Sequence, residues 1–376
     1  MLKKSLGTPS HEAVLIRKAF EKNIRLDGRR LLDWRETNVK LARDESRSEA
    51  DVTIGDTRVL VIVTGEIVKP FPDRPTEGML QFSADMCLTA EHAGFNQSVV
   101  CRLVERSIKD SECIDLESLT LVAGEQVWSI CCDIRVLSFH GNLIDATNLA
   151  VMSALRAFRK PEVSISLSED VEANTQQSYT MRNLKLYSSD EREPLPLALH
   201  HTPLSVSIGL FRLQGAAAVQ KEDDLDLSKK FPHGIVFVTD PSREEEQAMD
   251  GHITFSINSH SEICSIIMPG GTGLSVSAMM LASDLALDKA KALHASLLQA
   301  LQVLETEQVT AQAERLEVLR RLREAQERYH QGLASSSDSR GELITAISQG
   351  DGGLNLNDPI LRYDYTHVTT GCTVAK

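Results

Sequence analysis

The stretch VWSICCDIRVLSFHGNLIDATNLAVMSALRAF, residues 127–158, places a strand, a turn and a helix in direct succession. Residues 127–137 are rich in β-branched and aromatic side chains, which favour an extended conformation. The helix predicted for residues 141–158 is apolar almost all round, so we expect it to be buried and central. A strand followed at once by a buried helix is typical of an α/β domain.

The rest of the chain repeats this theme on both sides of the stretch. Towards the N-terminus we predict a helix over 11–23, strands within 50–68 and an amphipathic helix over 96–110. Towards the C-terminus, PLSVSIGLFRL, GIVFVT, HITFSIN and EICSIIM are predicted strands, and a helix follows PGGTGLS. The fold class is therefore α/β (or α+β), with two similar units.

Polar stretches divide the chain into predicted parts. From 275 to about 331 Gly and Pro are almost absent, which favours one long helix whose charged second half reaches away from the core. The boundaries we assign are a helix and arm at 1–30, a first domain at 31–165, a polar insertion or linker at 166–190, a second domain at 191–300 with an insertion at 216–233, and a helical extension with a mobile tail at 301–376.

Composition restricts the class of protein. The 376 residues carry a formal net charge of -13, which disfavours a protein that binds nucleic acid alone, because phosphate affinity needs a local excess of Lys and Arg. The first residues lack the apolar core of a signal peptide, and no apolar run approaches the about 20 residues that span a bilayer. We expect a soluble intracellular protein without a membrane partner.

The cysteines and histidines do not predict a metal site. The seven cysteines form no C-x-x-C pair, and several lie in apolar runs where reduced thiols pack as small hydrophobic groups. His200 and His201 are adjacent but lack a second pair of ligands at useful spacing. We predict no metal and no cofactor, and a reducing compartment.

An acidic cluster is the main candidate for chemistry. The stretch VTDPSREEEQAMDG, residues 238–251, holds five carboxylates: Asp240, Glu244, Glu245, Glu246 and Asp250. Such a cluster can hold divalent cations where phosphates react. It can equally be a turn after a strand, with carboxylates that are solvated or paired with Arg243.

Three further motifs have both a functional and a structural interpretation. PGGTGLS lacks the GK[ST] ending of a phosphate-binding loop, so a turn before a helix is favoured. The stripe Arg102, Arg106 and Lys109 on the 96–110 helix is either an RNA contact or a solvated face, and both interpretations stay open. Tyr363 and Tyr365 could dock on a partner, although a mobile tail is favoured.

Four stretches in order resemble the RNase PH-like family: RLDGRR, FPDRPTEG, residues 113–150 and VTDPSREEEQAMDG. The resemblance covers roughly residues 10–300 and is to the ring subunits of the eukaryotic RNA exosome. ESLTLVAGEQVW, GNLIDA and EREPLPLALHH make the 45-kilodalton type the most similar within that set. The resemblance implies two pseudo-symmetric βαβ units of the ribosomal protein S5 domain 2-like fold, here with a long C-terminal helical extension. It also implies that Arg29, in Asp27-Gly28-Arg29, ties the N-terminal segment to the domain.

The resemblance also implies a lost active site. Phosphorolytic members carry a Gly-Ser/Thr-Arg turn that holds phosphate, and here Leu143 stands in place of the Arg. Asp145 adds negative charge near this turn. Of the family's pair of aspartates spaced i, i+6, Asp250 matches the second, while Glu244 stands at the first. We therefore interpret Leu143, Glu244 and Asp250 as vestigial, with no catalytic residue.

The expected function is that of a non-catalytic structural subunit of the exosome core ring. It would help to form the channel that threads RNA for 3′-to-5′ processing and decay of rRNA and mRNA, in nucleus, nucleolus and cytoplasm. Expected partners are other RNase PH-like ring subunits, S1/KH cap subunits, hydrolytic exosome nucleases and single-stranded RNA. The residues expected to contact RNA are Arg102, Arg106, Lys109 and Arg74. Two rivals remain: a phosphate-dependent 3′ exoribonuclease using Glu244 and Asp250, and a stand-alone RNA-binding adaptor.

Overall fold

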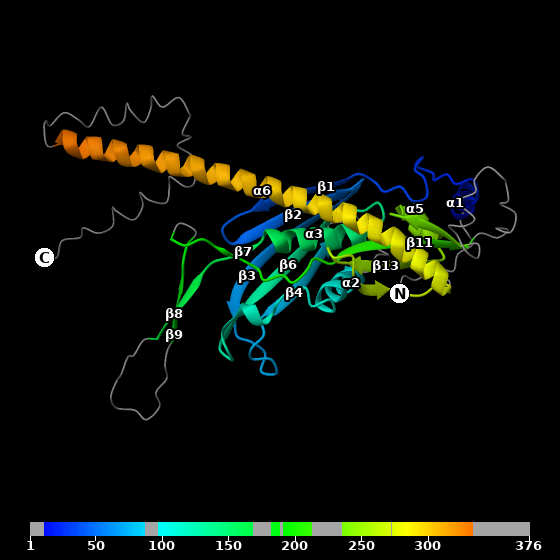
Figure 1. Cartoon of the computed structure of the whole chain (residues 1–376), viewed down its shortest axis with the longest axis horizontal. Helices are drawn as coiled ribbons and strands as arrows, with labels where there is room; N and C mark the ends of the chain where they lie inside the picture. The colour runs from blue at the N-terminus through cyan, green and yellow to red at the C-terminus, as the bar shows by residue number, and fades with distance from the viewer. Residues whose placement is uncertain are drawn as a thin grey trace. The chain divides into compact units, whose positions relative to one another are not determined.

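The computed structural model of the chain describes residues 11–86, 97–167, 182–188, 191–212, 235–271 and 273–333 (Figure 1). It divides into two units, Met1–Glu305 and Thr306–Lys376. The predicted insertion at 216–233, the C-terminal tail with Tyr363 and Tyr365, and most of the segment predicted as a linker lie outside the described residues.

The first sheet has six strands and packs against the core with one face. Its order is β1-β2-β3-β6-β4, with β5 beside β6. Alternate side chains on β2 and β3 are fully buried, as expected when one face of a sheet meets the core. The strands are β1 (Thr37–Arg43), β2 (Arg47–Ile54), β3 (Thr57–Val68), β4 (Met79–Met86), β5 (Thr120–Val122) and β6 (Gln126–Ser138).

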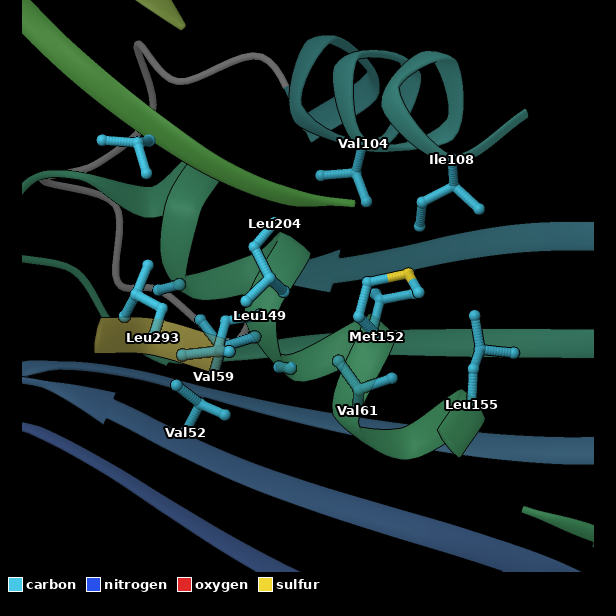
Figure 2. Close-up of a cluster of buried hydrophobic side chains, with 14 of the residues drawn as sticks. Val52, Val59, Val61, Val104, Ile108, Leu149, Met152, Leu155, Leu204 and Leu293 are labelled. Carbon is cyan, nitrogen blue, oxygen red and sulfur yellow. The ribbon is translucent and has the colours of Figure 1, made fainter. Parts of the chain in front are cut away.

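Helices α2 (Gln97–Lys109) and α3 (Leu143–Ala157) pack against this sheet, α2 at β4 and α3 at β2 and β3. The strands β4 and β6 are parallel, and α2 lies between them in the chain, which is the crossover that a parallel pair requires. Thirteen of the fifteen residues of α3 are buried, so the prediction of a buried central helix is confirmed. Figure 2 shows side chains from both helices, the first sheet, β11 and α6 in one cluster: Val52, Val59, Val61, Val104, Ile108, Leu149, Met152, Leu155, Leu204 and Leu293.

The second sheet lies against the other side of α3. It has the order β12-β11-β13-β14, and each neighbouring pair is antiparallel. The described part of the second sheet therefore contains no parallel pair. Among the described strands, β4 and β6 of the first sheet are the parallel pair that needs a crossover. In the second sheet, β13 and β14 are joined by a short hairpin loop. The strands are β11 (Leu204–Arg212), β12 (Ile235–Thr239), β13 (Gly251–Ile257) and β14 (Ile263–Ile267). The mixed α/β class is confirmed, and the two predicted α/β domains, one for each sheet, both lie within Met1–Glu305.

The N-terminal helix α1 (His11–Glu21) covers part of the second sheet together with the short helix α5 (Arg243–Ala248). Phe20 meets Phe211 of β11 edge to face, with ring centroids 4.7 Å apart. At the end of α1, Asn23 has a φ of 58°, and the amide of Ile24 donates to the carbonyl of Ala19, which is the usual left-handed helix ending. The predicted arm thus packs on the domain that is farther away in the sequence.

Two small ladders flank these sheets. β8 (Val163–Leu167) pairs with β9 (Arg182–Leu186), so the described ends of the segment predicted as a linker form a hairpin. β7 (Arg159–Lys160) pairs with β10 (Leu195–Pro196). A 3₁₀ turn, η2 (Glu117–Leu119), precedes β5.

The helix α6 (Val276–Leu333) has 58 residues, so the long C-terminal helix is confirmed. Its first half buries Ala278, Ala282, Ala286 and Ala290 in the core of the first unit. Within the described residues, no helix combines the length and the apolar character needed to cross a bilayer.

Candidate functional site

The turn that opens α3 lies against the turn between β12 and α5. Gly141 has a φ of 93°, and a Cβ placed on it would lie 2.5 Å from the carbonyl oxygen of Pro241. Asn142 has a φ of 55° in the left-handed region. Leu143 is 2% exposed and belongs to the hydrophobic core. The glycine is required because only a residue without a side chain permits this close approach of two backbones.

Asp240 is the polar centre of this contact. Its carboxylate is buried and accepts from Arg35 (Nε and Nη2, both 2.7 Å), from Arg29 (Nη1, 2.9 Å) and from Asn142 (Nδ2, 2.8 Å). Burial by itself would raise the pKa of Asp240, but the hydrogen bonds and charge of Arg35 hold the pKa below its ordinary value. The prediction that Arg29 ties the N-terminal segment to the domain is confirmed by its ion pair with Asp240.

All three nitrogens of the Arg35 guanidinium donate to groups of this chain. Besides Asp240, its Nη1 donates to the carbonyl of His140 (3.0 Å) and its Nη2 to the carbonyl of Gly141 (3.2 Å). This arginine lies beside the start of α3, where an anion would be attracted by the helix N-terminus. Its donors already bind a carboxylate and two carbonyls, so an added anion would have to displace them.

Glu246, on α5, places a carboxyl group at the start of α3. Its Oε1 accepts from the backbone amide of Asn142 at 2.7 Å. Burial raises the pKa of Glu246 to about 7, against the opposing effects of the Asn142 amide and the charge of Arg35. The carboxylate of Glu246 thus takes the place at the helix N-terminus that an external anion would need.

A buried ion pair holds the neighbouring part of the acidic cluster. Arg25 is 1% exposed and Glu245 is 2% exposed. Nε and Nη2 of Arg25 donate to the two carboxylate oxygens of Glu245, the first at 3.0 Å. The other donors of Arg25 reach the carbonyls of Thr239 (2.9 Å), Asp240 (2.8 Å) and Asp33 (3.3 Å). Glu245 also closes a capping box with Ser242 at the start of α5.

The two carboxylates predicted as a vestigial acid pair have separate surroundings. Asp250 accepts from Nη2 of Arg17 on α1 at 2.9 Å and from the amide of Arg212 at 2.8 Å. Glu244 is exposed on α5. The carboxylate that reaches the start of α3 is Glu246, which the sequence analysis did not single out. The guanidinium of Arg243 lies 6.0 Å from the centroid of the Phe139 ring, and the cluster is bound largely by arginines of the N-terminal arm.

Asp145 faces the second sheet. The ladder between β11 and β12 ends at Ile208 and Thr239, so the amides of Ser205 and Ser207 have no strand partner on that side. The carboxylate of Asp145 accepts hydrogen bonds from the amide and the hydroxyl of Ser207, each at 2.7 Å. The side-chain oxygen of Asn148 accepts from the amide of Ser205 at 3.0 Å. Burial raises the pKa of Asp145 to about 7. Its carboxylate oxygens are directed at the amide and hydroxyl of Ser207, and its expected effect as a negative charge near the turn stays a prediction.

The residues predicted to contact RNA lie at two exposed places. On α2, Arg106 pairs with Asp110 at 3.0 Å and Lys109 pairs with Glu105 at 2.7 Å, while Arg102 is exposed. These acidic partners lower the positive charge that the stripe presents.

Arg74 lies in the loop between β3 and β4 and pairs with Glu77 at 3.2 Å. Its side chain is 70% exposed, so the pair is solvated and can be exchanged for another anion at small cost.

The described residues contain no group of three or more His, Cys, Asp and Glu side chains arranged for a metal ion. His200 is exposed, and burial lowers the pKa of its neighbour His201. The described cysteines are free thiols, and burial raises the pKa of Cys113 to about 12, which makes that thiol unreactive.

Comparison with known protein families finds two matching descriptions. Residues 35–161 match domain 1 of the 3′ exoribonuclease family, and residues 230–289 match domain 2 of the same family.

Curated relatives are similar over most of the described core. The exosome complex component RRP45A of Arabidopsis thaliana is 31% identical over 288 residues, which are 75% of this chain and 83% of that protein. The exosome complex component RRP45 of Bos taurus is 36% identical over 260 residues, 68% of this chain. The match covers 51% of the bovine protein, so the chain spans about half the length of that relative.

Solved structures share the fold. A chain of the Archaeoglobus fulgidus exosome with RNA bound to the active site is 23% identical, with a TM-score of 0.56 over 75% of this chain and 96% of that chain. An archaeal exosome core chain gives a TM-score of 0.55 at 23% identity.

Proposed function

The chain belongs to the RNase PH-like 3′ exoribonuclease family, and from this premise we propose that it is a non-catalytic subunit of an exosome core ring. The relatives that share most of its length are named exosome complex components. Its role would be structural: it would build the ring and help to line the path of the RNA.

One observation carries the proposal that the subunit is non-catalytic. At the start of α3, where family members that use phosphate would hold it, Glu246 accepts from the amide of Asn142 and the side chain of Leu143 is buried. The Glu246 carboxyl already occupies the amide that a phosphate oxygen would use, and a leucine offers no donor in place of an Arg fork. Arg35, which lies beside this helix start, already donates to Asp240 and to the carbonyls of His140 and Gly141.

The test is RNA shortening by the chain assembled with its ring partners. A 5′-labelled single-stranded RNA is incubated with and without inorganic phosphate, and we expect no phosphate-dependent shortening that depends on this chain. The variant Leu143→Arg should remain inactive, because it adds one guanidinium to a buried position while Glu246 still fills the helix N-terminus. The proposal would be refuted if the wild-type ring shortened the RNA in a phosphate-dependent way and the variant Asp250→Asn abolished that shortening. Activity gained by Leu143→Arg alone would show that the remaining carboxylates suffice and that the site is latent.

We also propose that α2 and the Arg74 loop contribute to the RNA path. The support is chemical: Arg102, Arg106, Lys109 and Arg74 are exposed cations, and a channel for single-stranded RNA needs phosphate contacts without base readout. Because two of the cations on α2 are paired with carboxylates, the contribution should be moderate and should weaken as salt rises.

A charge reversal separates this role from general electrostatics. Arg102→Glu with Arg106→Glu should lower RNA retention by the assembled ring and leave assembly intact. Lys40→Glu with Arg58→Glu changes the same charge on exposed residues of β1 and β3 and serves as the matched control. Equal RNA retention in both variants would exclude α2 from the path.

The remaining expectations follow from membership of such a ring. The partners would be other RNase PH-like ring subunits, S1/KH cap subunits and hydrolytic nucleases. The chain would act in 3′-to-5′ processing and decay of rRNA and mRNA, in nucleus, nucleolus and cytoplasm. Copurification of these subunits with the tagged chain at equal stoichiometry tests the assembly, and a homo-hexamer would argue for a self-sufficient enzyme.

A further inference from the structure

The second half of α6 carries apolar side chains that no other described segment covers. In the second unit, Val309 and Leu316 are 64% and 67% exposed, and Leu319 and Leu322 are 43% and 42% exposed. We call these four residues the apolar row. The first half of the same helix instead buries its alanines in a core. A row of large apolar side chains in water is an unused contact surface.

The helix does not need the apolar row in order to form. Residues 306–333 are rich in Ala, Leu, Glu, Gln and Arg, which have high helix propensity. Ion pairs between Arg321 and Glu317 (2.6 Å) and between Arg320 and Glu324 (3.4 Å) add support at i, i+4 spacing. The row is therefore available for a partner.

The spacing of the row is that of a helix–helix seam. Val309, Leu316 and Leu319 stand at a and d positions of one heptad register, with Leu322 at their border. In this register Gln312 and Arg323 take the other d and a positions. In the same register, Arg315 and Arg320 stand at the g and e positions on the two edges of the seam. Glu314 and Glu317 fall on the opposite side of the helix, at about 3.6 residues per turn. The surface is thus apolar with basic edges.

Charge decides which partner fits this surface. A second copy would place Arg315 or Arg320 opposite another arginine in either orientation, which is unfavourable. RNA could bind the arginines but would leave the apolar row in water. A membrane-bound helix needs a basic polar face, whereas the polar face here is mixed, with Glu314 and Glu317 beside Arg321. An amphipathic helix with acidic edges covers the row and places a carboxylate beside each arginine. The Arg320–Glu324 pair is exposed, so exchanging its carboxylate for one of the partner costs little.

We propose that α6 from Thr306 onward docks an amphipathic helix of another protein, one with an apolar a/d seam and Asp or Glu at its e and g positions. The proposal is independent of the ring function, because it rests on the second unit alone.

The experiment uses the full chain and two synthetic four-heptad peptides. Both carry Leu at a and d, and they differ only in Glu or Lys at e and g. The like charges keep each peptide from pairing with itself. By fluorescence anisotropy, the Glu peptide should bind about tenfold or more tightly than the Lys peptide.

Three variants identify the surface. Leu316→Ser with Leu319→Ser should weaken binding of the Glu peptide by about tenfold or more. Arg315→Glu with Arg320→Glu should reverse the preference in favour of the Lys peptide. Glu307→Ser with Glu314→Ser, on the opposite side, is the matched control and should leave the preference unchanged. Circular dichroism checks that the helix content of each variant is kept.

Several results would overturn the proposal. Equal binding of both peptides, no binding, or full binding by the Leu316→Ser, Leu319→Ser variant would each do so. A wild-type chain that sediments as a dimer and becomes monomeric in that variant would assign the row to a second copy. If the Glu peptide fails to bind, the chain can be tested on phosphatidylserine vesicles and on an oligouridine RNA. Binding to either of these that is lost in the Arg315→Glu, Arg320→Glu variant would assign the surface to a lipid surface or to RNA.

Discussion

Replacing Arg25 by Met should release the N-terminal arm from the second sheet. The substitution keeps the length of the side chain but removes all five donors. It leaves the carboxylate of Glu245 buried without its partner and removes donors from the carbonyls of Thr239 and Asp240. Breaking a buried, hydrogen-bonded ion pair on one side costs about 3 to 5 kcal/mol of unfolding free energy. A domain of ordinary stability has about 5 to 15 kcal/mol in total, so the loss should be large.

The assay is urea denaturation of the full chain, followed by the fluorescence of its two tryptophans. Trp34 follows Asp33, whose carbonyl accepts from Arg25, and packs against the main core, whereas Trp128 lies in the first sheet. The variants Trp34→Phe and Trp128→Phe assign the transition to the surroundings of one tryptophan or the other. We expect Arg25→Met to lower the midpoint seen by Trp34 at least as much as that seen by Trp128. Because the cost comes from the stranded carboxylate, Arg25→Met with Glu245→Met should be more stable than the sum of the single changes predicts, by about 1 to 3 kcal/mol.

Arg58→Met is the control, because Arg58 pairs with Asp51 in solvent and its loss should leave the midpoint almost unchanged. An Arg25→Met variant no less stable than this control would refute the reasoning. So would a double variant whose loss equals the sum of the two single losses, because the pair would then contribute nothing as a pair.

Two further predictions concern the start of α3. The pKa of Asp145 is about 7 in the folded chain against 3.8 for the free side chain. Between these two pH values the folded state holds a proton that the unfolded state has released. The free energy of unfolding should therefore fall as pH rises from about 4 to about 7. Asp145→Asn should reduce this fall and make the variant more stable than wild type near pH 8, as measured by thermal unfolding across pH; an unchanged pH profile would contradict it. Gly141→Ala should destabilise the chain by about 1 to 3 kcal/mol more than Gly28→Ala. Both glycines have positive φ, but of the two only Gly141 lies against another backbone segment. Equal thermal midpoints of the two variants would contradict the close contact.

The sequence by itself determined the family and most of the long helices and strands, but not β1, β4 or the short helix α5. The strand and the buried helix of residues 127–158, the amphipathic α2 and the long α6 are all repeated local patterns, and local patterns can be read without knowing what they touch. The ordered motifs identified the family, whereas the interpretation of Leu143 as standing in place of the family's arginine stays a prediction. The role of Arg29 was also within reach, because it belongs to one of those motifs.

Only the tertiary structure decided how the acidic cluster is used. The sequence placed five carboxylates together but did not show that Glu246, and not Glu244, reaches the start of α3. It did not show that Arg25 and Arg35, more than 200 residues earlier in the chain, neutralise Glu245 and Asp240, or that Asp145 replaces a missing strand partner of β11. The physical reason is that burial, pKa and hydrogen-bond partners depend on which segments meet in space. A local pattern fixes which way a side chain can point, whereas the group that it meets is supplied by the packing of α1, α3 and α5 around the second sheet.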